Sequence, residues 1–152
     1  MPDTLIDCSL NRPEGFTEAW VCDREDDTWL DYLDSFGLKA ALLDAIAEAA
    51  ADRIGIFERM EVFAANRGVG AGRALRDETL SALKEAGAEV TMLFADLEAG
   101  NAFDLVAWYE RAGFVRIDRE VTDPFMMMGP ADLVNEARSI NGMPQLEETP
   151  AP

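Results

Sequence analysis

The chain has 152 residues, of which 49% are hydrophobic, so it is long and apolar enough for one folded domain and too short for two ordinary ones. Thirty Asp and Glu side chains outnumber thirteen Lys and Arg, and the formal net charge of −17 argues against binding to nucleic acid or to an anionic membrane. The absence of His excludes Ser-His and Cys-His nucleophile pairs, and with only two Cys we expect no metal site.

The start of the chain, Met1-Pro2-Asp3-Thr4, has no basic segment followed by an apolar one, as a secretory signal would. No apolar run approaches the roughly 20 residues that a membrane-spanning helix needs. Cys8 and Cys22 do not form a disulfide framework. We therefore expect a cytoplasmic protein, and a homodimer is compatible with the sequence.

The first half of the chain is expected to hold two helices and the beginning of a sheet. Met60 and Val62 would lie on one face of its last strand, and Glu61 and Phe63 on the other. In chain order the sequence predicts an irregular segment at 1–25 with a short strand at 19–22, helices at 28–36 and 38–52, and strands at 54–57 and 59–64.

The second half reads as strand and helix in alternation, which predicts an α/β domain over residues 1–140. The strands at 59–64 and 89–95 should be adjacent and parallel, because one helix joins them. The elements expected are helix 71–86, strand 90–95, a last helix ending at Gly113, strands 114–117 and 124–128 as a hairpin, and a mobile acidic, Pro-rich tail at 141–152.

Positive charge is concentrated in the middle of this acidic chain. Residues 59–84 carry five Lys and Arg against three Asp and Glu, whereas residues 1–58 carry four against fourteen and residues 85–152 carry four against thirteen. Such an island suits an anionic ligand, although a run of Arg on a solvated helix has the same composition.

The positive segment contains Arg67-Gly68-Val69-Gly70-Ala71-Gly72 where a strand gives way to a helix. Helix N-termini expose unpaired backbone N–H groups that bind phosphate, and glycines let the ligand approach the backbone. Arg73 and Arg76 could add charge. A P-loop would need Gly-Lys-Ser/Thr where Arg73-Ala74-Leu75 stands, and a dinucleotide fingerprint would need a small residue at 73. A flexible connector is the remaining alternative.

Two motifs resemble those of the GNAT N-acetyltransferases. The first is that family's pyrophosphate signature, Gln/Arg-x-x-Gly-x-Gly/Ala, whose first, fourth and sixth positions are matched by Arg67, Gly70 and Gly72. The stretch 101–114 resembles its second signature, in which an Asn opens a helix that closes with Tyr-Glu-x-x-Gly-Phe. The resemblance covers about residues 57–130.

The resemblance implies a mixed, twisted central sheet flanked by helices, and transfer of an acetyl group from acetyl-coenzyme A (acetyl-CoA) to a primary amine without a metal. It also implies that the strand 59–64 splays from its neighbour near Val62, and that Tyr109 donates a proton to the departing thiolate. An aromatic that only packs against the sheet is the alternative for Tyr109. The residues implied in cofactor binding are Val62, Phe63, Arg67, Gly68, Val69, Gly70, Ala71, Gly72, Arg73 and Asn101.

A carboxylate should accept the proton of the attacking amine, and three are candidates. Glu61 is next to the expected splay and Asp96 ends the central strand; we rank both above Glu58, which shares strand parity with Val62. The surrounding acidity favours a cationic acceptor, such as a polyamine, an aminoglycoside, a Lys side chain or a protein N-terminus. Because the helix 38–52 leaves little room for the family's early strands, a non-catalytic CoA-binding or protein-interaction module is the alternative function.

Overall fold

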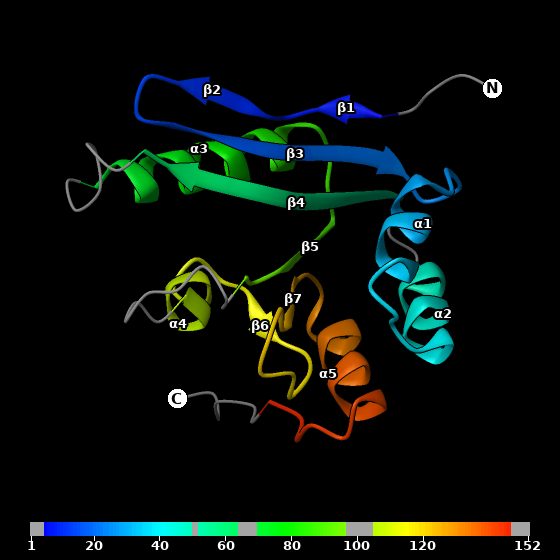
Figure 1. The fold of residues 1–152 in the computed structure, drawn as a ribbon. Helices are drawn as coiled ribbons and strands as arrows, with labels where there is room; N and C mark the ends of the chain where they lie inside the picture. Colours follow the sequence, from blue (N-terminus) through cyan, green and yellow to red (C-terminus); the bar gives the residue numbers. More distant parts are fainter. Residues whose placement is uncertain (1–4, 50–51, 64–69, 97–104, 147–152) are drawn as a thin grey trace, which may run out of the picture.

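The computed structural model describes residues 5–49, 52–63, 70–96 and 105–146. They contain a mixed seven-stranded sheet with strand order β1-β3-β4-β5-β7-β6, in which β2 also pairs with β3 (Figure 1). The predicted α/β fold, with a central sheet flanked by helices, is confirmed. The strands are β1 (Ile6–Asp7), β2 (Leu10–Arg12), β3 (Gly15–Asp23), β4 (Arg53–Val62), β5 (Val90–Phe94), β6 (Val115–Arg116) and β7 (Phe125–Met128).

Helices cover both faces of the sheet, and each face has its own hydrophobic core. On one face, hereafter the α1 face, α1, α2 and α5 pack against Trp20, Ile54 and Ile56. On the other, hereafter the α3 face, α3 and α4 pack against Val21 and Phe57. The helices are α1 (Thr28–Asp34), α2 (Ala40–Glu48), α3 (Ala71–Glu85), α4 (Leu105–Glu110) and α5 (Ala131–Ile140). In the described part of the chain, none of them has the length and apolarity to cross a membrane.

Residues 5–23 form strands, so the expectation of a mostly irregular N-terminal segment was wrong. Both β1 and β2 pair antiparallel with β3, which runs for nine residues. Most of the residues of β1 and β2 are exposed, and they lack the apolar alternation that marks a strand in a sequence. These strands supply the early part of the sheet for which the sequence analysis found little room.

Three further boundaries differ from the prediction. The helix expected at 38–52 covers only Ala40–Glu48, and the two strands expected at 54–57 and 59–64 form the single strand β4. α5 follows the helix that we expected to be the last. The segment after it is also tied down in part, because the Leu146 backbone N–H donates to Asn135 Oδ1 in α5 (2.9 Å).

β4 and β5 are adjacent and parallel, as predicted, and α3 makes the crossover between them. Their register pairs Ile54 with Val90, Gly55 with Thr91 and Ile56 with Met92. Beyond that point β4 pairs only with β3 and β5 only with β7. The strands therefore part directly after Ile56, well before Val62, where the sequence analysis placed the splay.

A β-bulge in β4 accompanies this parting. β3 pairs Glu18 with Arg59 and Ala19 with Phe57, so Glu58 is the extra residue. A bulge bends its strand and interrupts the alternation of side chains between faces. Glu58 lies on the α1 face, where Trp20 Nε1 donates to Glu58 Oε2 (3.1 Å), whereas Val62 lies beside α3. The prediction that Glu58 and Val62 share a face was therefore wrong.

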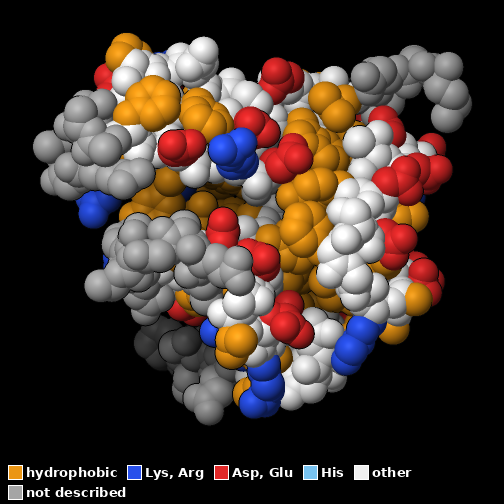
Figure 2. All heavy atoms as spheres, in the orientation of Figure 1, with side chains coloured by type: hydrophobic (Ala, Val, Ile, Leu, Met, Phe, Trp, Pro, Cys, Tyr) orange, Lys and Arg blue, Asp and Glu red, His pale blue; other side chains and the backbone are white. Residues whose placement is uncertain are grey.

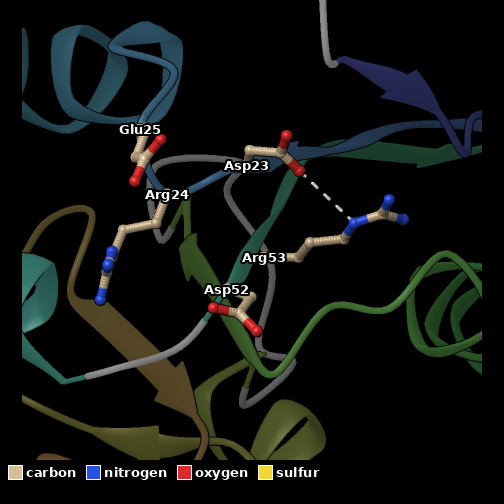
Figure 3. A pocket seen from close by; sticks show the side chains of 5 residues that line it. All are labelled: Asp23, Arg24, Glu25, Asp52 and Arg53. Atoms are coloured by element: carbon tan, nitrogen blue, oxygen red, sulfur yellow. Dashed lines mark ion pairs between the residues drawn. The ribbon is translucent and has the colours of Figure 1, made fainter.

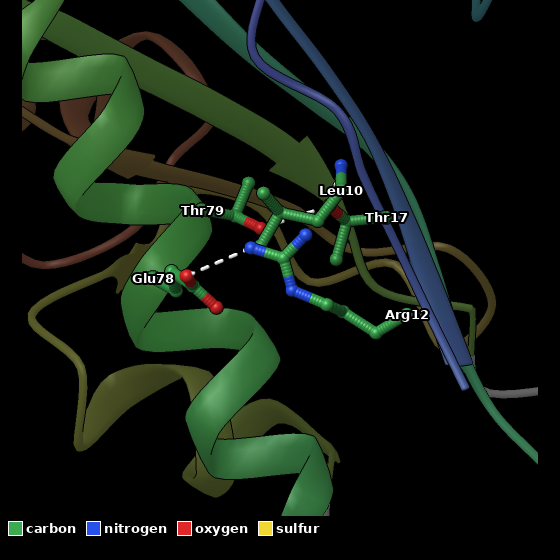
Figure 4. Close-up of polar contacts among 5 residues, drawn as sticks. All are labelled: Leu10, Arg12, Thr17, Glu78 and Thr79. Atoms are coloured by element: carbon green, nitrogen blue, oxygen red, sulfur yellow. Dashed lines mark hydrogen bonds and ion pairs between the residues drawn. The ribbon is translucent and has the colours of Figure 1, made fainter. Parts of the chain in front are cut away.

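A small polar contact joins α3 to the N-terminal strands (Figure 4). Buried Thr17 on β3 and Thr79 on α3 share a hydrogen bond of 2.8 Å between their hydroxyls. Thr17 Oγ1 also accepts the backbone N–H of Leu10 (3.0 Å). At the surface beside them, Arg12 pairs with Glu78 (2.9 Å). The buried hydroxyl of Thr17 thus serves β2, β3 and α3 together.

Thr17→Val is expected to lower the free energy of unfolding by about 2 kcal/mol, because it leaves both the Leu10 N–H and the Thr79 hydroxyl without this partner. Thr79→Val should cost about 1 kcal/mol, since Thr17 still accepts from Leu10. Arg12→Gln is the control, because an ion pair this exposed contributes under about 1 kcal/mol. Urea unfolding of the three variants measures the order; equal losses for Thr17→Val and Arg12→Gln would contradict it.

Candidate functional site

β4 and β5 part beyond Ile56 and Met92, and this place is hereafter called the opening. On the α1 face, Glu58 follows the last paired residue of β4 by two positions, and Phe94 follows that of β5 by two. The ring of Phe94 packs against that core and lies 5.0 Å from the ring of Phe125. On the α3 face, the residues at the same level are Phe57 and Leu93. The place where the strands part therefore has a carboxylate on one face of the sheet and apolar side chains on the other.

Tyr109 of α4 lies on the α3 side of this opening. Its ring meets the ring of Phe57 edge-on at 6.2 Å and that of Phe114 at 5.8 Å, and only 7% of the residue is exposed. Burial raises the pKa of Tyr109 to about 12, with a smaller opposing effect from the positive charge of Arg76. The phenol is therefore protonated at neutral pH, as a proton donor has to be.

Arg76, which the sequence suggested as added charge for a phosphate, is held against α4. It is 6% exposed, and its guanidinium lies 4.5 Å from the ring of Trp108. Its Nη1 atom donates to the carbonyl oxygen of Trp108 (2.9 Å), and its Nε atom donates to Asp77 (2.9 Å). Arg76 therefore ties α3 to α4 next to Tyr109.

The N-terminus of α3 has the features of an anion site. Gly70 caps it with a φ of 83°, which glycine adopts without strain, and offers no side chain to the free N–H groups. The first turn has no acidic residue, and Arg73 is exposed there. A Cβ built on Gly72 would lie 3.4 Å from Val62 Cγ2 and 3.6 Å from Trp108 Cζ2. The end of β4, the start of α3 and α4 therefore meet at this place.

The predicted cofactor residues fall into two groups. Val62, Phe63 and the segment 70–73 lie together at the end of β4 and the start of α3. Phe63 is 40% exposed, and its backbone N–H donates to the carbonyl oxygen of Glu14 (2.8 Å). Arg67, Gly68, Val69 and Asn101 lie outside the described residues.

The three candidate carboxylates differ in their surroundings. Glu58 is exposed at the opening and accepts from Trp20 Nε1. Glu61 lies further along β4 and pairs with Arg59 (3.7 Å). Asp96 is exposed two residues past Phe94. Glu58, ranked last from the sequence, is therefore the one that the bulge places at the point where the strands part.

A separate pocket of about 250 Å³ lies at the far end of β4 (Figure 3). It is lined by charged residues, among them Arg53, the first residue of β4, which pairs with Asp23 (3.4 Å). Both partners are about half exposed, so the pair is a surface feature of small energy. None of the predicted site residues lines this pocket. Its full lining is Asp23, Arg24, Glu25, Asp52 and Arg53.

No protein-family model matches the sequence, and no curated protein is significantly similar to it. The solved structures that match the chain include the following three. Protein PH1933 from Pyrococcus horikoshii OT3 is 16% identical with a TM-score of 0.48, and the match covers 77% of this chain and 58% of the PH1933 chain. The NatC complex bound to Gag peptide and CoA is 16% identical with a TM-score of 0.49, and the match covers 79% of this chain and 63% of the NatC chain. Arylalkylamine N-acetyltransferase 2 from Aedes aegypti is 10% identical with a TM-score of 0.48, and the match covers 76% of this chain and 67% of the acetyltransferase chain.

The chain thus spans 58% to 67% of the length of these structures. Two of the three names mention CoA or N-acetyltransfer. Identities of 16% or less and TM-scores below 0.5 carry no argument about the activity of this chain.

Proposed function

We propose that this chain is an N-acetyltransferase that moves an acetyl group from acetyl-CoA to a primary amine, with a cationic acceptor and a cytoplasmic location. The observation that carries the proposal is the opening between β4 and β5, which has Glu58 on one face and the protonated Tyr109 on the other. The glycine-capped start of α3 lies beside the end of β4 on the Tyr109 side.

In this proposal the two faces have different tasks. The N-terminus of α3 binds the pyrophosphate of the donor, with Arg73 as an added positive charge. The end of β4 at Val62 and Phe63 contacts the pantetheine arm. The thioester then lies in the opening, within reach of residues from both faces.

Glu58 accepts a proton from the acceptor ammonium, directly or through a water, and frees the nitrogen lone pair. The C–N bond forms as this nitrogen attacks the thioester carbonyl carbon, the nitrogen gives up its second proton to water, and the C–S bond breaks. Tyr109 donates its proton or a hydrogen bond to the leaving thiolate sulfur. The products are the amide and the free thiol of CoA. Glu61 and Asp96 are the alternative bases.

Thermal unfolding with and without acetyl-CoA tests the donor half of the proposal. Ligand at a hundred times its dissociation constant adds about 2.7 kcal/mol of stability, so the melting temperature should rise by several degrees. A screen of amines for thiol release tests the acceptor half. An unchanged melting temperature at millimolar acetyl-CoA would contradict the proposal. A raised melting temperature without turnover of any amine would indicate a CoA-binding module instead.

A further inference from the structure

Four aromatic side chains on the α1 face form a continuous patch beside Glu58. Phe36, just after α1, stacks on Phe94 of β5 with ring centroids 3.9 Å apart and an interplanar angle of 13°. Tyr32 of α1 lies edge-on to Phe36 (5.2 Å) and to Trp20 of β3 (5.9 Å). The sequence analysis did not identify this aromatic patch, whose members are Trp20, Tyr32, Phe36 and Phe94.

The patch is partly open to solvent. Phe36 is 46% exposed although Phe94 covers one of its faces, so a large part of its side chain is accessible. Tyr32 and Phe94 are half-buried. In Figure 2 a band of apolar side chains runs through the middle of the molecule and is bordered by Asp and Glu side chains. An aromatic surface of this kind binds a flat apolar group, and its ring faces attract a cation.

A negative charge stands directly against the patch. Glu58 Oε2 accepts the N–H of the Trp20 ring (3.1 Å), and Glu58 raises the pKa of Tyr32, an effect second only to the burial of that phenol. The nearest positive charge along β4 is Arg59, which is occupied by Phe16 (5.2 Å) and the carboxylates of Glu18 (4.0 Å) and Glu61 (3.7 Å). The Glu58 carboxylate therefore has no cation paired with it among the described residues.

We infer that the aromatic patch and Glu58 select the acceptor, and that it is a small monoamine carried on an aromatic ring. Its ring lies on Phe36 and Phe94, and its ammonium group lies at Glu58, where the two strands part. This inference rests on the proposed function, because the amine is an acceptor only if the chain transfers acetyl groups. The binding site itself is argued from the geometry of these residues alone. A polyamine or an aminoglycoside would leave the aromatic surface uncovered.

Binding without a donor separates ring recognition from charge recognition. The probes are 2-phenylethylamine, n-butylamine, which lacks the ring, 2-phenylethanol, which lacks the charge, and spermidine, a polycation. Calorimetry of the full chain should show 2-phenylethylamine binding roughly fivefold more tightly than each of the other three, because ring contact and ion pairing each contribute about 1 kcal/mol. Equal or tighter binding of spermidine would overturn the inference.

Variants assign each part of this preference. Phe36→Ala should weaken 2-phenylethylamine roughly 3- to 10-fold and leave n-butylamine unchanged. Phe36→Leu keeps apolar bulk and removes the ring, so it should retain only part of the affinity. Leu146→Ala is the matched control, since Leu146 is a large apolar residue of similar exposure (42%) outside the patch. Glu58→Gln should weaken both amines and spare 2-phenylethanol.

The outcomes also distinguish this inference from the proposed function. If 2-phenylethylamine binds through Phe36 but no amine is acetylated, the patch is a binding site and the acetyl transfer is wrong. If spermidine is acetylated and Phe36→Ala leaves its KM and its affinity unchanged, the acetyl transfer stands and the selection of aromatic amines is wrong. Identical losses in Phe36→Ala and Leu146→Ala would also overturn the assignment of the patch.

Discussion

Replacing Tyr109 with Phe is expected to slow acetyl transfer by about 10²- to 10⁴-fold, the range of general acid catalysis, while the affinity for acetyl-CoA changes little. The substitution removes the hydroxyl and keeps the ring contacts to Phe57 and Phe114. Single-turnover rates should be compared, because slow product release would hide part of the loss in kcat.

Tyr109→Ala is the matched control for this experiment. It removes the same hydroxyl together with the ring, so it should lose both the rate and a few kcal/mol of stability, whereas Tyr109→Phe should lose only the rate. A Tyr109→Phe variant with the single-turnover rate of the wild type would assign Tyr109 to packing alone.

The raised pKa of Tyr109 adds a pH test. Because burial shifts this pKa upward to about 12, the phenol keeps its proton beyond about pH 10, where an ordinary tyrosine ionises. The single-turnover rate should therefore hold its level through about pH 10, and a rise in pH toward 12 should then remove the proton donor and the rate. A fall centred near pH 10 that is absent from Tyr109→Phe would contradict this environment.

Gly72→Glu is expected to abolish acetyl-CoA binding and to leave the fold intact. The backbone of Gly72 has no positive φ, and its Cβ would make ordinary contacts with Val62 and Trp108. A carboxylate in the first turn of a helix also suits the helix dipole, so stability should hold. Its negative charge would stand where the pyrophosphate approaches the N–H groups of α3. Calorimetric titration with CoA measures the loss.

Gly72→Ala is the control for crowding, since it adds the Cβ without the charge, and it should weaken CoA binding far less than Gly72→Glu. Gly70→Glu is a poorer test than Gly72→Glu. With a φ of 83° at Gly70, any side chain strains the backbone, and loss of binding could then follow from loss of the cap. Wild-type affinity in Gly72→Glu would mean that the phosphates bind elsewhere.

The parts of the fold with strong local signals were predictable. α3 runs from Ala71 to Glu85 and is stopped by Gly87 with a φ of 94°, and β5 and the β6–β7 pairing lie where the pattern put them. Their apolar periodicity is regular, and glycine marks the helix end. The strands β1 and β2 were not predicted, because their residues are mostly exposed. Helix α5 was not predicted, because it follows Pro130 without a side-chain cap.

The site was less predictable than the fold, because its geometry depends on one break in alternation. In the sequence, the alternation of apolar and polar residues breaks at Phe57-Glu58-Arg59-Met60. Only the pairing with β3 shows that Glu58 is an extra residue in the strand. The aromatic patch depends on tertiary contacts between β3, α1 and β5, which lie far apart in the sequence. The spacing of Tyr32 and Phe36 by one helical turn was the local signal that could have drawn attention to it.

The bulge at Glu58 also bears on how such a chain can diverge. In the proposed reaction, side chains for the amine come from α1, β3 and the α1 face of β4 and β5, while those for the donor come from α3, α4 and the α3 face. Both β4 and β5 contribute to the two sides, but with different residues on each. Mutations that retune the acceptor can therefore accumulate on one surface without altering the machinery on the other, so acceptor choice is free to drift while donor use is inherited unchanged.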